Sequence, residues 1–482
     1  METCDIEETC DTDIGNRARY EAPGDEVARD EAPGGTGIER VKTIRQRVIA
    51  LSWPALIEMI LVTLVGMVDM IMVGRLGPAA ITAVGLTNQP MFLALAVFMA
   101  LNVGTTAIVA RAIGSGRPDE ANATTRQSMI LTCIMGIAFS VLGYMLAGDI
   151  IRLMGAAEDV MPLGTSYMQF IAMGGLFVTL SMSLSSALRG AGDTRTPMRI
   201  NVIANLLNVI GNYALIYGKL GFPVLGVAGA AISTTFSRFV ACAMILRVIY
   251  GGGSVIALSL RDRYSIDPDL VKRILRIGFP AAVEQFILRG GQLAYVRIVA
   301  GFGTVTFAAH QIAMNILGLS FMPGQAFSVA ATTLVGQGLG AGSHAFAQRA
   351  ALETRKLGMI VSGTMAAGFF FFGRQIAALY TSDPTVIAKT AMVLKIIGLV
   401  QPAQSTQFIL AGGLRGAGDT KWPLYSTFIG IWGVRVVLGY ILAVVFRLEL
   451  LGAWIAMAVD QCVRSAIIYM RFRTGAWKNE RV

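Results

Sequence analysis

A single acidic residue interrupts one of the most apolar stretches of the sequence. Asp69 lies within Val-Gly-Met-Val-Asp-Met-Ile-Met-Val-Gly, residues 65–74. An ionised carboxylate inside a membrane costs roughly 2.5–3.5 kcal/mol on insertion scales, so one that is retained there is a functional candidate. Such a group can take up a proton or bind a cation such as Na⁺. The alternative is structural: Asp69 is paired with a neighbouring helix or reaches the outer interface.

Three neutral polar residues are candidates to complete a site with Asp69. Asn208 and Asn212 are four residues apart, so they share one face of a helix. A rise of 1.5 Å per residue places Asn212 about 18 Å and Thr234 about 15 Å into their helices, and Asp69 about 22 Å beyond Pro54. These depths are similar, so we expect Asp69 and these three residues to bind the coupling ion. In the alternative, the two Asn and Thr234 form hydrogen bonds that join helices.

Two prolines are each followed, four residues later, by a glutamate. The pairs are Pro54 with Glu58 and Pro280 with Glu284. A proline removes a helix hydrogen bond, so Pro54 can act as a hinge; in the alternative, both prolines begin their helices. Glu58 and Glu284 are secondary polar sites, although capping or pairing between helices explains them as well.

Arginine is unusual within a membrane-spanning segment, and a functional role is then the default hypothesis. Arg289 and Arg297 lie in such a segment and are secondary candidates for contact with substrate, while Glu284 or water in a cavity can satisfy them instead. We expect pairs between helices for the remaining charged residues of the spans, which are Arg238, Arg435, Asp460 and Arg464.

Sequence motifs for ATP hydrolysis or covalent catalysis are absent. The only Gly-Lys pair, Gly218-Lys219, is followed by Leu220, so there is no GxxxxGK[ST] loop. The sequence has two His and no HExxH, no GxSxG and no pair of Cys at CxxC spacing. We expect no enzymatic activity, no cofactor and no metal site other than Na⁺ at Asp69. A membrane-embedded enzyme is a distant alternative that lacks its catalytic residues.

These residues belong to a chain that is too apolar for a soluble protein. Of its 482 residues, 54% are hydrophobic and 15% charged, against about 25% charged in soluble domains. Repeated runs of 18 or more mostly apolar residues indicate membrane-spanning helices. We predict an all-α polytopic membrane protein with twelve transmembrane helices, near residues 48–72, 81–108, 128–148, 163–187, 200–218, 225–249, 278–300, 306–335, 357–377, 390–412, 424–446 and 452–470.

Lysine and arginine are distributed unevenly between the loops. They gather before the first span, after the last one and in alternate loops between, whereas the other loops hold mainly isolated basic residues. Cytoplasmic loops carry such an excess, which predicts a multi-pass protein of the cell inner membrane with both termini in the cytoplasm. The net charge of +10 follows the same pattern, so we expect no nucleic-acid partner.

The sequence contains an internal duplication. Leu-Arg-Gly-Ala-Gly-Asp-Thr at residues 188–194 returns at 414–420, an offset of 414 − 188 = 226. Each repeat holds six spans and therefore keeps the same orientation, which predicts two pseudo-symmetric six-helix lobes around a central cavity. Four further pairs share the offset: Pro54 and Pro280, Glu58 and Glu284, Gly77 and Gly303, and Gly114 and Gly340.

The duplication divides the chain into five segments. Residues 44–250 are expected to form the N-lobe, and residues 277–470 the C-lobe. Residues 251–276 are polar and basic, as in a cytoplasmic linker. Residues 1–43 are acidic with few large apolar side chains, which predicts a disordered tail. Residues 471–482 are expected to form a basic cytoplasmic tail.

From about residue 44 to 470 the chain resembles the multidrug and toxic compound extrusion (MATE) family of the MOP flippase superfamily. The resemblance is carried by Val-Asp-Met-Ile-Met-Val-Gly-Arg-Leu-Gly (68–77), Ala-Arg-Ala-Ile-Gly-Ser-Gly (110–116), both copies of Leu-Arg-Gly-Ala-Gly-Asp-Thr, Gly-Val-Ala-Gly-Ala-Ala (226–231) and Gly-Phe-Pro (278–280). It implies a twelve-helix fold and efflux of cationic or amphipathic compounds in exchange for H⁺ or Na⁺. It also implies that Asp69 binds the coupling ion and that Pro54 is associated with bending of the first helix.

The sequence departs from the family at three acidic positions. Many members have Asn-x-x-x-Asp on helix 5, where this chain has Asn208-x-x-x-Asn212. Second-lobe carboxylates of the sodium-coupled bacterial branch align with Leu288 and Gln404. These residues lack the carboxylates of a second-lobe ion site, and Asp69 is the main candidate acid.

The sequence thus predicts a secondary active multidrug efflux antiporter that works by alternating access. Its expected partners are drug-like small molecules and membrane lipids, and we expect a monomer. The alternative within transport is a flippase for lipids or lipid-linked substrates, because Arg289, Arg297 and Arg435 can hold a phosphate group.

Overall fold

The computed structural model describes residues 37–259, 261–262 and 264–480, and side chains from residue 41 onward. Of the tail predicted at residues 1–43, residues 1–36 lie outside this part. Within it, every regular element is a helix, as expected. The α-helices are α2 (Gly37–Gly74), α3 (Pro78–Gly114), α4 (Pro118–Met145), α5 (Ala147–Leu153), α6 (Met161–Met173), α7 (Gly175–Gly190), α8 (Arg195–Tyr217), α9 (Gly226–Tyr250), α10 (Pro268–Ala300), α11 (Thr304–Gly340), α12 (His344–Ala378), α13 (Pro384–Gly416), α14 (Lys421–Phe428), α15 (Val437–Tyr440) and α16 (Glu449–Thr474). Two π-helices, η1 (Ile429–Val436) and η2 (Ile441–Val445), and a 3₁₀-helix, η3 (Ala476–Asn479), complete the set.

Most of the twelve predicted spans have a helix that meets the length and polarity of a membrane crossing. Within the described residues ten helices do so, and the pair α6 and α7, bent by 44°, makes eleven. The remaining span is α10, which is long enough at 33 residues but carries several charges. The span predicted at 163–187 is therefore broken, at Gly174 between α6 and α7, rather than one straight helix.

Several helices extend beyond the predicted spans. Their ends are polar, and hydropathy identifies only the apolar part of a helix. α2 begins at Gly37 and α10 at Pro268, so residues predicted as tail and linker are helical. Pro54 and Pro280 are interior to these helices, which excludes the alternative that they begin them. At the other end, α16 continues to Thr474, and Trp477 beyond it is fully buried, so the predicted C-terminal tail is largely folded.

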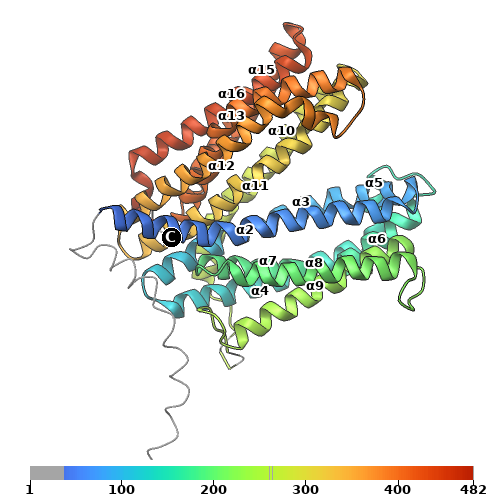
Figure 1. The fold of residues 1–482 in the computed structure, drawn as a ribbon. Coiled ribbons are helices and arrows are strands. Elements are labelled where there is room, and N and C mark those ends of the chain that lie inside the picture. The colour runs from blue at the N-terminus through green and yellow to red at the C-terminus, as the bar shows by residue number, and fades with distance from the viewer. Residues whose placement is uncertain (1–36, 260, 263, 481–482) are drawn as a thin grey trace, which may run out of the picture.

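The two repeats form two groups of helices, α2–α9 and α10–α16. They converge at the end that carries the C-terminus and diverge toward the end that carries α5 and α15 (Figure 1). Close contacts at the convergent end join α3 to α11. A Cβ at Gly114 would overlap the backbone of Gln337, and a Cβ at Gly340 would overlap that of Arg111. These contacts are equivalent, since 114 + 226 = 340 and 111 + 226 = 337.

The first helix of each repeat, α2 and α10, contacts both lobes. The first half of α2 places Val48 in a core cluster with Phe327 and Leu334 of α11, in the opposite lobe. The first half of α10 likewise places Ile274 in a cluster with Ile108 of α3. Past Pro54 and Pro280, each helix packs in its own lobe, α2 against α8 and α10 against α14 and η1. The two prolines therefore lie where α2 and α10 pass from one lobe to the other.

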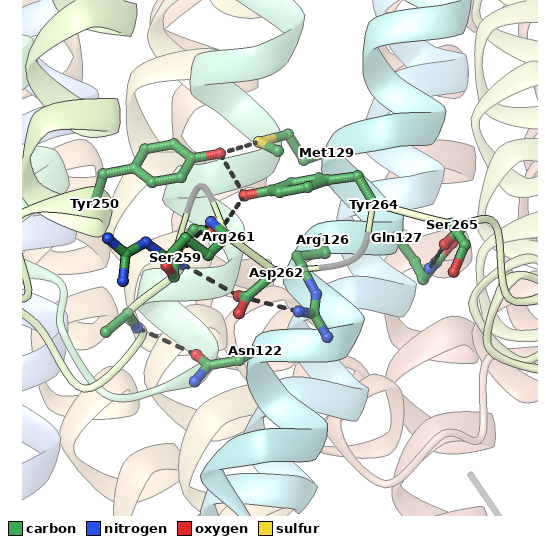
Figure 2. Close-up of polar contacts among 11 residues, drawn as sticks. Asn122, Arg126, Gln127, Met129, Tyr250, Ser259, Arg261, Asp262, Tyr264 and Ser265 are labelled. Carbon is green, nitrogen blue, oxygen red and sulfur yellow. Dashed lines mark hydrogen bonds and ion pairs between the residues drawn. The ribbon is translucent and has the colours of Figure 1, made fainter.

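The chain between α9 and α10 is bound to the side of α4 (Figure 2). Arg126 pairs with Asp262 at 3.0 Å, and Gln127 donates to the carbonyl oxygen of Ser265 at 2.7 Å. Asn122 accepts a hydrogen bond from the linker backbone at 3.1 Å. The connection between the lobes is thus fixed to the N-lobe up to the start of α10.

Candidate functional site

The structure brings together all four residues predicted for the ion site. Asp69 lies on α2, Asn208 and Asn212 on one face of α8, and Thr234 on α9. Asn212 Nδ2 donates to Asp69 Oδ1 at 2.6 Å. When the Asn208 amide is oriented so that its oxygen accepts from Thr234 Oγ1 at 3.1 Å, its nitrogen donates to both carboxylate oxygens, at 3.0 and 3.2 Å. Two amides therefore hydrogen-bond the one carboxylate.

The site has an unused acceptor. Asn212 is fully buried, and its Oδ1 has no hydrogen-bond partner among the described residues. A buried acceptor without a partner is unfavourable, so the site is suited to one additional donor or cation. Na⁺ would be held by the Asp69 carboxylate and Asn212 Oδ1, whereas a proton would need the carboxylate alone. One carboxylate supplies charge for one monovalent ion.

A positively charged residue that the sequence assigned only to a pair between helices completes this region. Arg238 is four residues from Thr234 on α9 and donates to Asn201 Oδ1 at 3.5 Å. Its guanidinium interacts electrostatically with both Asp69 and Glu58. The spacing of Thr234 and Arg238 on one helix face was the available signal, but the sequence does not say which face meets α2.

Glu58 and Glu284 form equivalent ion pairs rather than open polar sites. Arg189 Nη2 donates to Glu58 Oε1 at 2.5 Å, and Arg415 Nη2 donates to Glu284 Oε1 at 2.8 Å. The two arginines are the second residues of the repeated Leu-Arg-Gly-Ala-Gly-Asp-Thr segment. Asn201 and Thr427, which also occupy equivalent positions of the two repeats, add hydrogen bonds at 2.8 and 3.0 Å. The pairing between helices that was weighed for both glutamates is therefore present.

The second lobe has no free carboxylate at the position equivalent to Asp69. That position is Tyr295, since 69 + 226 = 295, whereas Asp460 occupies the position of Thr234. Asp460 is fully buried between Arg435, at 2.5 Å, and Arg464, at 3.1 Å. The Arg435 pair joins η1 to α16 as expected, but the Arg464 pair lies within α16. Held by two arginines, this carboxylate is not available to an ion.

Arg289 and Arg297 do not pair with Glu284, which is held by Arg415. Both are exposed, and neither has an ion pair in the part of the chain that the structure describes. The guanidinium carbon of Arg289 lies 5.9 Å from the ring centre of Phe92, on α3 of the opposite lobe. Arg297 lies in the last turn of α10.

Comparisons with known proteins find relatives along most of the chain. The sequence model of the family described as MatE matches residues 54–214 and 280–441, and its two matches begin at equivalent prolines of the repeats, Pro54 and Pro280. The "Probable multidrug resistance protein NorM" of Thermotoga maritima is 34% identical over 452 residues, covering 92% of this chain and 95% of that protein. The "Multidrug resistance protein PmpM" of Pseudomonas aeruginosa is 30% identical over 410 residues, covering 83% and 84%.

Solved structures share the whole fold. One is described as the "outward-facing conformation of a multidrug resistance MATE family transporter of the MOP superfamily"; it has a TM-score of 0.83 at 25% identity and covers 89% of this chain and 95% of that one. A MOP superfamily transporter from Pyrococcus furiosus, described with a binding pocket of reversed polarity, has a TM-score of 0.83 at 25% identity and covers 91% and 97%.

Proposed function

The chain belongs to the MATE family of transporters, and we propose that it exports drug-like compounds in exchange for one H⁺ or Na⁺. The observation that carries the proposal is the hydrogen-bonded group of Asp69, Asn208, Asn212 and Thr234 on three helices of one lobe. A lone carboxylate held by amides inside a membrane can alternate between an ion-loaded and an ion-free state. The multidrug resistance relatives support drug-like substrates.

In the proposed cycle, Asp69 links ion binding to the movement of α2. When the carboxylate is ionised, Asn208 and Asn212 hydrogen-bond it and tie α2 to α8. When an ion neutralises it, these hydrogen bonds lose their charge-assisted strength. Because α2 contacts both lobes, weakening its hydrogen bonds to α8 can change the packing between the lobes. Pro54 lies at the crossing and is the proposed hinge.

The proposed location is the cell inner membrane, with both termini in the cytoplasm. In that orientation the end at which the lobes diverge faces outward (Figure 1). The cytoplasmic end is then the one closed by the contacts of α3 with α11. We propose a monomer, since the ion site is built from one chain.

The test is transport by the purified chain in vesicles. Efflux of a fluorescent cation should follow an imposed pH or Na⁺ gradient without nucleotide. Vesicles without a gradient are the control. Transport that requires ATP and ignores both gradients would overturn the proposal.

A flippase for lipids or lipid-linked substrates is a second candidate. Arg289 favours it, because it is exposed and has no ion pair among the described residues, and a phosphate group needs such a partner. Arg435 no longer supports it, since that side chain is committed to Asp460.

A further inference from the structure

Arg289 lies at a depth where an unpaired charge is costly. It precedes the end of α10 at Ala300 by about three turns, or about 16 Å of helix. The only carboxylate nearby on its own helix, Glu284, is occupied by Arg415 and Thr427. Arginine within a membrane usually faces a protein interior or an aqueous space and marks a substrate path. Arg297, in the last turn, can instead reach the interface.

Arg289 faces the space between the lobes rather than the interior of its own lobe. α10 and α3 touch closely at Gly278, where a Cβ would lie 2.6 Å from the carbonyl oxygen of Ala100. Arg289 lies about three helical turns beyond that contact along α10, and Phe92 lies about two turns beyond it along α3. Phe92 is 55% exposed, so α10 does not cover its ring there. The Arg289 guanidinium extends from α10 to the Phe92 ring.

The equivalent position in the other repeat has no such charge. Subtracting 226 from 289 gives Thr63 on α2, and adding 226 to 92 gives Gly318 on α11. A Cβ at Gly318 would meet nothing within 4 Å. The gap beside α11 is therefore open at the position where the gap between α3 and α10 holds the ring of Phe92. Because the fold forms one of these gaps without an arginine or an aromatic residue, the fold itself does not require Arg289.

We propose that Arg289 binds an anionic group of the transported compound, and that the preferred substrates are amphipathic molecules with one carboxylate or phosphate. The inference rests on the proposed function and names its substrate class. A guanidinium donates two parallel hydrogen bonds to either group, which a neutral ester cannot accept with the same strength. The aromatic or apolar body of the substrate takes the place of the guanidinium on the exposed ring of Phe92.

The test compares a rhodamine dye that has a free carboxylate with its methyl ester, in vesicles that contain the purified chain. The wild type should export the carboxylate dye with a kcat/KM about tenfold higher, as expected for one charged hydrogen-bonded pair. Arg289→Gln should lose this preference while it still exports the ester at the wild-type rate. Arg289→Lys should keep part of the preference, since its charge remains without the paired geometry.

Arg374→Gln is the matched control, because Arg374 is also exposed near the outer end of a C-lobe helix but lies away from α3. It should keep the full preference. Equal export of both dyes by the wild type, or equal loss of both in Arg289→Gln, would overturn the inference and leave the antiporter proposal intact. Failure of the wild type to export either dye under any gradient would overturn both.

A fluorescent phosphatidylglycerol in the same vesicles identifies the source of the anion. Gradient-dependent translocation that Arg289→Gln abolishes would place the anionic group on a lipid. Transport of the dye without the lipid would place it on a soluble amphiphile. Both results support the anion site.

Discussion

At the residue scale, each repeat holds a carboxylate among its helices, but the two carboxylates lie at non-equivalent positions and have different partners. Asp69 is held by neutral amides, whereas Asp460 is held by two arginines. Polar residues within apolar segments predicted the members of the Asp69 site. The sequence gives both the spacing of the two Asn on α8 and the depth of Asp69 along α2 and of Thr234 along α9. The sequence does not show which neighbouring helix a side chain faces. Arg238 was therefore assigned to a helix pair, although its charge acts on Asp69.

Removal of the Asn212 amide should impair coupling without unfolding the protein. Asn212→Ala removes the 2.6 Å hydrogen bond to Asp69, and we expect gradient-driven efflux to fall about tenfold, the effect of a charged hydrogen bond. Asn205→Ala is the control, because Asn205 is buried on the same helix but its amide nitrogen has no partner among the described residues. Efflux rates per inserted protein are the measurement. Equal losses in both variants would remove Asn212 from the site.

A second carboxylate at Asn212 should strengthen cation binding. Asn212→Asp would place another negative charge 2.6 Å from Asp69, so two charges would face one cation. We expect the Na⁺ concentration that half-saturates binding to decrease, as measured by calorimetry on the purified protein. Normal insertion with unchanged Na⁺ binding would contradict this geometry.

At the element scale, hydropathy located the membrane helices but not their breaks. α6 and α7 are separated at Gly174, where a Cβ would press on Thr235 of α9. The π-helix η1 includes Gly430, which packs against Asp460 and Arg464 of α16. The break at Gly174 and the π-helix both depend on contacts with other helices. A hydropathy average over a window of residues contains no information on such contacts. The paired prolines were visible in the sequence, but their place between the lobes was not.

Loss of one buried glutamate should destabilise its lobe. Glu284→Gln leaves Arg415 without its countercharge, which costs about 3–5 kcal/mol when a buried pair is broken. We expect a lower melting temperature and less inserted protein. Replacing both residues with Gln should recover part of the loss, because no isolated charge remains. A double variant as unstable as the single one would argue against the pair.

Restoring a hydrogen bond in α2 should reduce the rate of transport without reducing stability. Pro54→Ala supplies the missing N–H inside a continuous helix, so the melting temperature should stay equal or rise. If bending at this residue is part of the cycle, the efflux rate should fall. Wild-type efflux in a stable Pro54→Ala protein would show that α2 does not need this hinge.

At the scale of the whole molecule, the N-lobe carries the negative group of Asp69, and the facing side of the C-lobe carries Arg289, which has no ion pair within the described part of the chain. The duplication, with its constant offset between equivalent positions, predicted the lobes. Close glycine contacts hold them together at one end, and the charges differ because equivalent positions carry different residues. Because of this asymmetry, we propose that the N-lobe binds the ion at Asp69 and that the C-lobe binds the substrate at Arg289.

Asp69→Asn tests whether Asp69 couples ion movement to export. The variant removes an ionisable group and keeps the size of the side chain, so folding and insertion should be normal. In vesicles with an imposed gradient, we expect substrate to bind to Asp69→Asn while gradient-driven efflux is lost. Efflux at the wild-type rate by the purified, folded variant would show that Asp69 does not couple ion movement to export.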